Sequence, residues 1–394
     1  MENFVYEYPT KVLFGKGAAK EHLGKELSAC GPNVMLAYGS GSIRKNGIYD
    51  EMMEILRGAG KTVTEFHGIM PNPTYAKVQE GAALAREKKI DFILAVGGGS
   101  VIDCCKVIAA QAVLDEDIWD MELVSHRLPA VPPIPMGAVV TASGTGAEMN
   151  GGAVITHEEK KVKTGIFAAA PRFAVLDPDY TMSVPFTQVI SGAFDTLSHA
   201  METYFGRADR DNVSDDLAEA VMRNTIRNMR FLLQNPNDYT ARSNLMWDSA
   251  MAENDILKCG RVTDFQAHQI EHQFGAYTDC NHGQGLAVIH PPLYRVMCDK
   301  APEKFARFAV NVWGVSSQGK TERELALAGV DALANFIKEC GLPVRLSELH
   351  MKTDALKLLA PETLKEIADS SNLIGTGYAP VSHEEIFQIL RECL

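Results

Sequence analysis

The sequence predicts a two-domain chain in which a parallel α/β domain precedes an all-α domain. In the first half, short apolar runs rich in β-branched residues alternate with helical stretches, which is typical of a parallel sheet covered on both faces. After about Pro185 the segments have helical patterns only. The length of 394 residues suits two domains, and we place them at residues 1–185 and 186–394.

Five segments of the first half are predicted as strands, because each is short, mostly apolar and bounded by turn-forming residues. They are residues 34–38, 61–66, 91–96, 134–140 and 173–176. Residues 74–89 are rich in Ala, Lys and Glu and follow Pro71-Asn72-Pro73, which predicts a helix. In the second half, helices are predicted at residues 189–205, 215–233, 240–257, 264–277, 304–312, 321–340 and 383–393. The breaks between them are Gly206, Asn235-Pro236, Gly260, Gly283 and Gly341-Leu342-Pro343.

The composition excludes several classes of partner. Lys and Arg total 38 and Asp and Glu total 50, so the formal net charge is −12. We therefore expect neither a nucleic-acid backbone nor an anionic membrane as a partner. No window reaches the roughly 18 apolar residues that a membrane-spanning helix needs, and the acidic, aromatic N-terminus is not a signal peptide. The eight cysteines include no Cys-x-x-Cys pair, so we expect reduced thiols in a cytoplasmic protein.

A glycine-rich turn follows the third predicted strand. Gly97-Gly98-Gly99-Ser100 comes directly before a helical stretch, so the backbone can approach a ligand closely and free N–H groups face it. This arrangement suits a phosphate. The dinucleotide pattern G-x-G-x-x-G is not met, however, because Ile102 occupies its last position.

Two further turns strengthen the prediction of a phosphate site. Gly39-Ser40-Gly41-Ser42 also ends a strand, and residues 141–148 supply hydroxyl groups after another. Three such turns at the carboxyl ends of parallel strands suit one dinucleotide across the edge of the sheet, which predicts a Rossmann-like nucleotide-binding domain. No acidic residue stands at 39–42 to hold a ribose 2′-hydroxyl, whereas Arg44 and Lys45 would attract a 2′-phosphate. We therefore expect NADP(H) to be preferred over NAD(H).

The helical half contains a histidine pattern that predicts a metal site. Asp195 and His199 lie one turn apart on one helix, as do His268 and His272 on another, and His282 follows in a glycine-flanked loop. The neighbouring residues are apolar, so these faces are predicted to point inward, where a buried carboxylate and several imidazoles need a compensating charge. Mixed nitrogen and oxygen ligands suit Zn²⁺ or Fe²⁺.

The spacing of these histidines leaves one alternative open. His268-x-x-Glu271-His272 also matches the H-x-x-E-H pattern of zinc metallopeptidases, with Glu271 as the base. A peptidase would leave the glycine-rich turns of the first half without a role. His290 precedes Pro291-Pro292 and is predicted to be structural, capping a proline-rich turn.

Taken with these motifs, the sequence resembles the iron-containing (metal-dependent) alcohol dehydrogenase family, especially its butanol dehydrogenase and NADPH-dependent aldehyde reductase branch. The resemblance covers nearly the whole chain in order, and its most specific part is the set Asp195, His199, His268 and His282. Its other segments are Phe14-Gly15-Lys16-Gly17, residues 38–47, Pro71-Asn72-Pro73-Thr74, residues 97–103, residues 145–150, Leu176-Asp177-Pro178, residues 194–202 and Met246-Trp247.

The resemblance implies roles for individual residues. His272 would lie near the nicotinamide and pass a proton between the substrate oxygen and solvent, and Asp103 would hold the nicotinamide ribose. The implied metal ligands are Asp195, His199, His268 and His282. The implied cofactor contacts are Gly39, Ser40, Gly41, Ser42, Asn72, Gly97, Gly98, Gly99, Ser100, Asp103, Thr141, Thr145, Lys161 and Tyr180.

The implied activity is reversible hydride transfer between NADP(H) and a primary alcohol or aldehyde of the butanol and butanal kind. The family also implies one divalent metal, Fe²⁺ or Zn²⁺, and a homodimer. Glycerol dehydrogenases and dehydroquinate synthases share the two-domain plan and stay open as alternatives. The metal-bearing segments are mostly apolar, which favours a small neutral substrate over the polyanion of a synthase.

Overall fold

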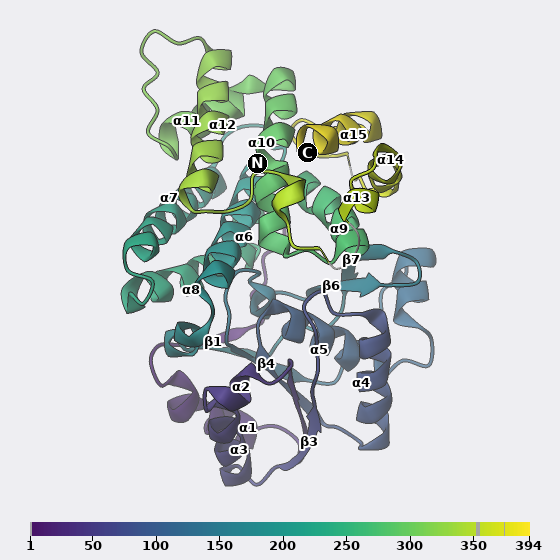
Figure 1. The fold of residues 1–394 in the computed structure, drawn as a ribbon. Helices are drawn as coiled ribbons and strands as arrows, with labels where there is room; N and C mark the ends of the chain where they lie inside the picture. The colour runs from purple at the N-terminus through teal and green to yellow at the C-terminus, as the bar shows by residue number, and fades with distance from the viewer. Residues whose placement is uncertain (1, 352–354, 374) are drawn as a thin grey trace. The chain divides into compact units, whose positions relative to one another are not determined.

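The computed structural model describes residues 2–351, 355–373 and 375–394, which form two compact units (Figure 1). One is the α/β segment Glu7–Pro185 and the other is the helical segment Phe186–Leu394. Residues 2–6, which we assigned to the first domain, pack with the helical unit instead. There the Glu2 N–H donates to the Gly260 carbonyl oxygen at 3.2 Å. The predicted fold class, a parallel α/β unit followed by a helical unit, is confirmed.

The α/β unit is built on a six-stranded parallel sheet with the order β1-β8-β5-β4-β2-β3. Its strands are β1 (Lys11–Phe14), β2 (Asn33–Tyr38), β3 (Thr62–Phe66), β4 (Phe92–Gly97), β5 (Met136–Val140) and β8 (Phe173–Leu176). The five predicted strands are all present. β1 was not predicted, because it is a short strand at the edge of the sheet with Phe14 exposed.

Both faces of this sheet are covered. Val34 and Leu36 of β2 pack on one face with Leu23 and Leu56 in a single apolar cluster. α5 packs against β4 and β5, and every residue of β4 is buried. The helical elements of this unit are η1 (Ala19–Leu23), α1 (Gly24–Ser28), α2 (Ser42–Lys45), α3 (Ile48–Gly58), α4 (Tyr75–Glu87), α5 (Gly99–Gln111), η2 (Asp120–Val124), η3 (Ala147–Met149) and η4 (Pro178–Ser183).

An antiparallel hairpin was missed by the sequence analysis. Its strands are β6 (Gly152–His157) and β7 (Val162–Phe167), and β6 packs against α5. Lys161 lies at the tip of the hairpin with a φ of 51°, a left-handed conformation that is uncommon for a residue other than glycine. The Thr156 N–H donates to the Pro73 carbonyl oxygen at 2.9 Å, which ties the hairpin to the turn that contains Asn72.

The described residues of the second unit form helices and connecting loops, with an isolated antiparallel bridge between Arg207 and Val262. Its elements are α6 (Phe186–Tyr204), α7 (Val213–Gln234), α8 (Tyr239–Glu253), η5 (Ile256–Lys258), α9 (Gln266–Thr278), α10 (His282–Lys300), α11 (Pro302–Asn311), α12 (Glu322–Glu339), η6 (Leu346–Glu348), α13 (Ala355–Leu358), α14 (Pro361–Ser370) and α15 (His383–Glu392). Every residue of α6 from Ala193 to Tyr204 is buried, so its polar side chains must be satisfied inside the unit. Within the described segments, we find no helix with the length and apolar character needed to cross a membrane.

The predicted break near Gly283 is present at residues 279–281, but a helix that was not predicted follows it. α10 begins at His282 and continues through Pro291 and Pro292 to Lys300. His290 therefore caps no turn: it is fully buried in this helix, with its Nε2 atom 2.6 Å from the Ser198 hydroxyl oxygen. Proline normally interrupts a helix because it lacks an N–H group and clashes with the preceding turn, and here tertiary packing overrides that preference.

Candidate functional site

The four predicted metal-ligand residues come together inside the helical unit. Asp195 and His199 lie one turn apart on α6, His268 lies in the first turn of α9, and His282 is the first residue of α10. The Asp195 Oδ1 atom is 3.7 Å from His199 Nδ1 and 3.5 Å from the Nε2 atoms of His268 and His282. Side chains from three helices thus converge on one carboxylate oxygen.

The donor atoms of this cluster fit a divalent cation. Asp195 Oδ1, His199 Nδ1 and His268 Nε2 are buried and have no hydrogen-bond partner. Buried polar atoms without partners are costly in a folded protein, and a metal ion would satisfy all three at once. Asp195, His268 and His282 each offer one ligand atom within a span of 4.8 Å, and one carboxylate with imidazoles suits Zn²⁺ or Fe²⁺.

The charge of Asp195 depends on the imidazoles around it. Burial raises the pKa of this carboxyl, but the neighbouring His199 and His282 lower it further, so its pKa lies below the usual range. For His199, burial dominates and lowers the pKa. The cluster therefore favours an ionised Asp195 carboxylate, the form that binds metals. Burial lowers the pKa of His268, but Glu202 and Asp195 raise it to about 10.

The helix that carries His268 is bounded by two unusual backbone conformations. Phe265 before α9 has a φ of 48° and Asp279 after it has a φ of 51°. A bulky residue in the left-handed region costs on the order of 1–3 kcal/mol and persists only when its surroundings enforce it. α10 starts more conventionally, because the Asn281 side chain caps it by accepting from the Gln284 N–H at 3.1 Å. Together these ends fix where His268 and His282 point.

Two buried glutamates contact the ligand imidazoles. The Glu202 carboxylate hydrogen-bonds His268 Nδ1, and the Glu271 carboxylate hydrogen-bonds His282 Nδ1. The sequence analysis missed Glu202, although it lies on the same face of α6 as Asp195 and His199, three residues after the latter. Glu271 is fully buried and its carboxylate is hydrogen-bonded to His282. This environment does not fit the exposed general base of a metallopeptidase.

His272 lies beside the ligand cluster. Its ring centre is 5.5 Å from that of His282 and 5.8 Å from that of His268. It is buried, with 8% of its surface exposed. This position agrees with a group that exchanges protons near the metal centre.

In the α/β unit, the three glycine- and hydroxyl-rich turns lie at neighbouring strand ends. Tyr38, the last residue of β2, pairs with Val96, and Gly97, the last residue of β4, pairs with Val140 of β5. The chain runs from β2 outward to β3 and then returns to β4 on the other side of β2. Such a reversal opens a crevice at the carboxyl ends of the strands, where ligands bind in open α/β sheets.

The glycines of the 97–100 turn are required by close packing. A Cβ atom at Gly99 would lie 2.3 Å from the Thr145 hydroxyl oxygen, and one at Gly97 would lie 2.5 Å from a Val101 methyl carbon. The Thr141 N–H donates to the Gly97 carbonyl oxygen at 3.0 Å. The turn therefore brings α5, which begins at Gly99, against the Thr141–Thr145 loop.

Two predicted cofactor contacts have structural surroundings that the sequence did not show. Asp103 accepts from the Val154 N–H at 3.0 Å and lies 3.4 Å from Lys106 Nζ, so it joins α5 to the β6–β7 hairpin. Lys161 is exposed at the hairpin tip, whereas Lys163 of β7 is only 6% exposed.

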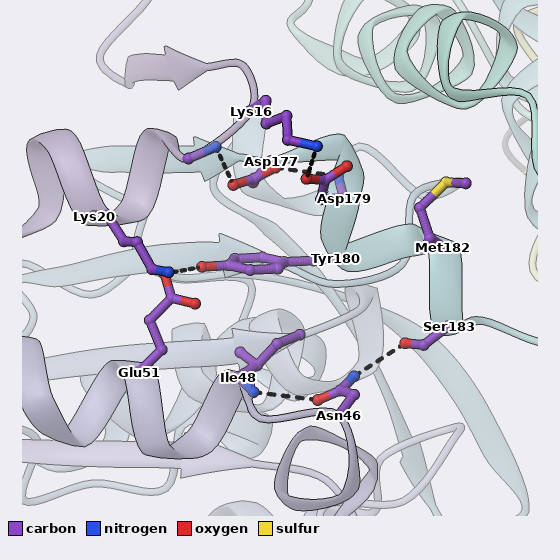
Figure 2. Close-up of a pocket in the computed structure, with 11 residues that line it drawn as sticks. Lys16, Lys20, Asn46, Ile48, Glu51, Asp177, Asp179, Tyr180, Met182 and Ser183 are labelled. Atoms are coloured by element: carbon purple, nitrogen blue, oxygen red, sulfur yellow. Dashed lines mark hydrogen bonds and ion pairs between the residues drawn. The ribbon is translucent and has the colours of Figure 1, made fainter.

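Tyr180 lines a pocket of about 580 Å³ in the α/β unit (Figure 2). Its hydroxyl donates to Glu51 at 2.8 Å, while Asn46 hydrogen-bonds Ser183 at 3.0 Å. Asn46 directly follows α2, which begins at Ser42 of the 39–42 turn, so this turn and the pocket are connected through α2.

Arg44 is held in place rather than free. Its guanidinium donates to Glu65 at 2.6 Å and to the Tyr38 hydroxyl, and it lies over the Tyr49 ring at 3.9 Å. The turn at 39–42 contains no acidic residue, but Glu65 of the neighbouring strand β3 faces Arg44.

Glycine-rich turns at the carboxyl edge of a parallel sheet, together with a buried carboxylate–imidazole cluster, are the components of a metal-dependent dehydrogenase. Comparison with known proteins agrees. Residues 9–178 match the family described as iron-containing alcohol dehydrogenase, and residues 189–394 match the C-terminal part of the Fe-containing alcohol dehydrogenase family. The chain therefore belongs to the iron-containing alcohol dehydrogenase family, and the expected oxidoreductase class is confirmed.

Individual relatives cover the whole length of the chain. It is 38% identical to a probable NADH-dependent butanol dehydrogenase 2 of Bacillus subtilis, over 100% of both chains. It is 35% identical to the NADPH-dependent aldehyde reductase YqhD of Escherichia coli, over 94% of both. The structure resembles that of an NADH-dependent butanol dehydrogenase A from Thermotoga maritima with a TM-score of 0.91, at 34% identity, over 100% of this chain and 99% of the other.

Proposed function

We propose that this protein is a metal-dependent alcohol dehydrogenase and aldehyde reductase that transfers a hydride reversibly between NADP(H) and a small primary alcohol or aldehyde such as butanol or butanal. The convergence of Asp195, His199, His268 and His282 around one carboxylate oxygen carries the proposal, since it leaves buried polar atoms that a cation would satisfy. The names of the relatives, butanol dehydrogenases and an aldehyde reductase, support the substrate class.

The chemistry divides between the metal ligands and one adjacent histidine. Asp195 and the three imidazoles would hold one Fe²⁺ or Zn²⁺ ion, which supplies a Lewis acid for the substrate oxygen when bound. His272, beside the cluster, would carry a proton between the substrate oxygen and solvent. The ring of Phe265 lies 5.4 Å from that of His268, so the surroundings of the centre are suited to an apolar substrate.

The cofactor would be held by the strand-end turns of the α/β unit. The N-terminus of α5 with Gly97, Gly98, Gly99 and Ser100 would bind the pyrophosphate through free N–H groups and the helix dipole. Asp103 would hold the nicotinamide ribose. The other proposed contacts are Gly39, Ser40, Gly41, Ser42, Asn72, Thr141, Thr145, Lys161 and Tyr180.

A preference for NADP(H) is part of this proposal. The 39–42 turn has no carboxylate to repel a 2′-phosphate, and Arg44 is already oriented next to that turn by Glu65 and Tyr49. The relatives divide on this point, since the butanol dehydrogenases are named NADH-dependent and the aldehyde reductase NADPH-dependent. The ratio of kcat/KM for the two cofactors decides it.

The test combines elemental analysis with a coupled assay. We expect purified protein to contain close to one equivalent of iron or zinc, and to reduce butanal with NADPH faster than with NADH. Chelation should abolish turnover, and the metal should restore it. His268→Ala should lose turnover but keep NADPH binding, while His350→Ala, at an exposed histidine of the same unit, should behave as wild type. Full turnover after complete metal removal, or none with any alcohol, aldehyde or cofactor, would overturn the proposal.

A further inference from the structure

Two carboxylates outside the predicted ligand set are bonded to the rear nitrogen atoms of two ligand imidazoles. Glu202 on α6 bonds His268 Nδ1, and Glu271 on α9 bonds His282 Nδ1. In both histidines the opposite nitrogen, Nε2, lies 3.5 Å from Asp195 Oδ1. In each imidazole, therefore, Nδ1 is bonded to a glutamate and Nε2 points toward the proposed metal position.

Glu202 acts on both the side chain and the backbone of His268. Its carboxylate accepts from the Ala267 N–H at 2.6 Å and from the His268 N–H at 3.1 Å, in addition to His268 Nδ1. These backbone donors belong to the first turn of α9, whose N–H groups have no partners within the helix. One carboxylate thus fixes the start of α9 and the ring that this turn carries.

Glu271 is held in a site shaped for it. It is fully buried, and the Cys280 thiol lies 3.9 Å from its Oε1 atom. A Cβ atom at Gly285 would lie 2.9 Å from Glu271 Cγ, so the glycine leaves the space that this side chain fills. The bond to His282 therefore depends on packing between α9 and α10.

The bonding pattern decides which nitrogen faces the metal. A carboxylate oxygen that accepts a backbone N–H, as in Glu202, can only accept from the imidazole, so His268 Nδ1 carries the hydrogen and Nε2 presents its lone pair. Such carboxylate partners orient ligand imidazoles and raise their basicity. Glu202 and Glu271 would also add negative charge close to a cation bound at Asp195.

We infer that Glu202 and Glu271 are positioning residues of the metal centre, which set the orientation and donor strength of His268 and His282. The inference rests on the proposed metal site. His199 differs from these two, because it faces Asp195 Oδ1 through its Nδ1 atom and not through Nε2.

Glu271→Gln is the cleanest probe. A glutamine oxygen still accepts from His282 Nδ1 and its amide can face the Cys280 sulfur, so the fold is retained while the negative charge is lost. Glu202→Gln would turn an amide donor toward an N–H group, so it also disturbs the start of α9. Asp248→Asn is the matched control, because Asp248 is a buried carboxylate of the same unit that bonds Asn224 and Thr225 and contacts no ligand histidine.

The measurement is Zn²⁺ or Co²⁺ affinity of full-length protein, by competition with a chelator of known affinity, together with the Co²⁺ absorption spectrum. We expect Glu271→Gln to weaken metal binding by about 10- to 100-fold, and Glu271→Ala to weaken it more. Glu202→Gln should weaken it by at least as much, with a lower Tm in the metal-free protein. The Co²⁺ bands should move in the Glu271 variants and stay in place in Asp248→Asn.

The outcomes separate this inference from the proposed function. If wild-type protein binds neither Zn²⁺ nor Co²⁺, the metal site itself is refuted, and the positioning role with it. If wild type binds metal and Glu271→Gln and Glu271→Ala bind it equally well with an unchanged spectrum, only the positioning role is refuted. A drop in Tm without a change in affinity would show that the glutamates serve the fold alone, which also refutes the inference.

Discussion

Gly99→Ala tests whether the 97–100 turn binds the cofactor. The added Cβ would lie 2.3 Å from the Thr145 hydroxyl oxygen and 2.9 Å from Thr145 Cβ, so the turn and the Thr141–Thr145 loop must separate. Overpacking of this kind costs about 1–3 kcal/mol. Since 1 kcal/mol corresponds to about 2–4 °C in a domain of this size, we expect the Tm to fall by about 2–12 °C.

The kinetic effect should fall on the cofactor. Displacing the N-terminus of α5 moves the N–H groups proposed to bind pyrophosphate, so the KM for NADPH should rise at least about tenfold, the equivalent of 1.4 kcal/mol, while metal content stays unchanged. The double variant Gly99→Ala/Thr145→Ala removes the group that is overlapped and should recover part of the Tm. The assay is butanal reduction at varied NADPH, with Tm by calorimetry. A single variant with unchanged Tm and unchanged KM for NADPH would refute the steric argument and the assignment of the turn.

Three further predictions concern other parts of the molecule. Gly285→Ala should lower metal affinity by displacing Glu271, although alanine favours the helix by about 1 kcal/mol; chelator competition measures it, and unchanged affinity contradicts it. Burial raises the pKa of Glu148 to about 7, above its unfolded value, so folding takes up a proton and stability should decrease as pH rises from about 4.5 to 7; Glu148→Gln should flatten that part of the pH–stability curve, and an identical slope refutes the assignment. Arg44→Ala should raise the KM for NADPH more than that for NADH, whereas an equal effect on both would separate Arg44 from the 2′-phosphate.

Periodicity and composition predicted most of the elements that carry the site. The residues from Phe92 to Gly97 are apolar throughout, because β4 is buried on both faces of the sheet. A continuous apolar run of this kind predicts such a strand from the sequence. The β6–β7 hairpin could not be predicted, because Gly152 and the charged residues around Lys161 interrupt the alternation of apolar and polar residues that is typical of a strand. α10 was not predicted, because Pro291-Pro292 locally indicates the end of a helix. Packing against α6, α9 and α12 instead stabilises a helix that continues through both prolines.

The proposed ligand residues could be singled out because their spacing is helical, but the carboxylates that contact them could not. Asp195 and His199 share a helix face. His268 could be grouped with them only because imidazole and carboxylate groups are both metal-ligand types. Glu202 lies on that same face, yet nothing in the sequence says that it meets α9, which begins some sixty residues later. Contacts between helices depend on tertiary geometry. Those contacts determine which buried carboxylates hydrogen-bond the histidines.

The gap that Pro292 leaves in α10 is closed from the far end of the chain. Without a Pro292 N–H, the Val288 carbonyl has no donor one turn ahead, and the Cys393 thiol approaches it at 3.6 Å. The Cys393 carbonyl in turn accepts from the Leu346 N–H at 2.8 Å. α10 also begins with His282, so loss or oxidation of the Cys393 thiol would loosen the helix that supplies one of the imidazoles.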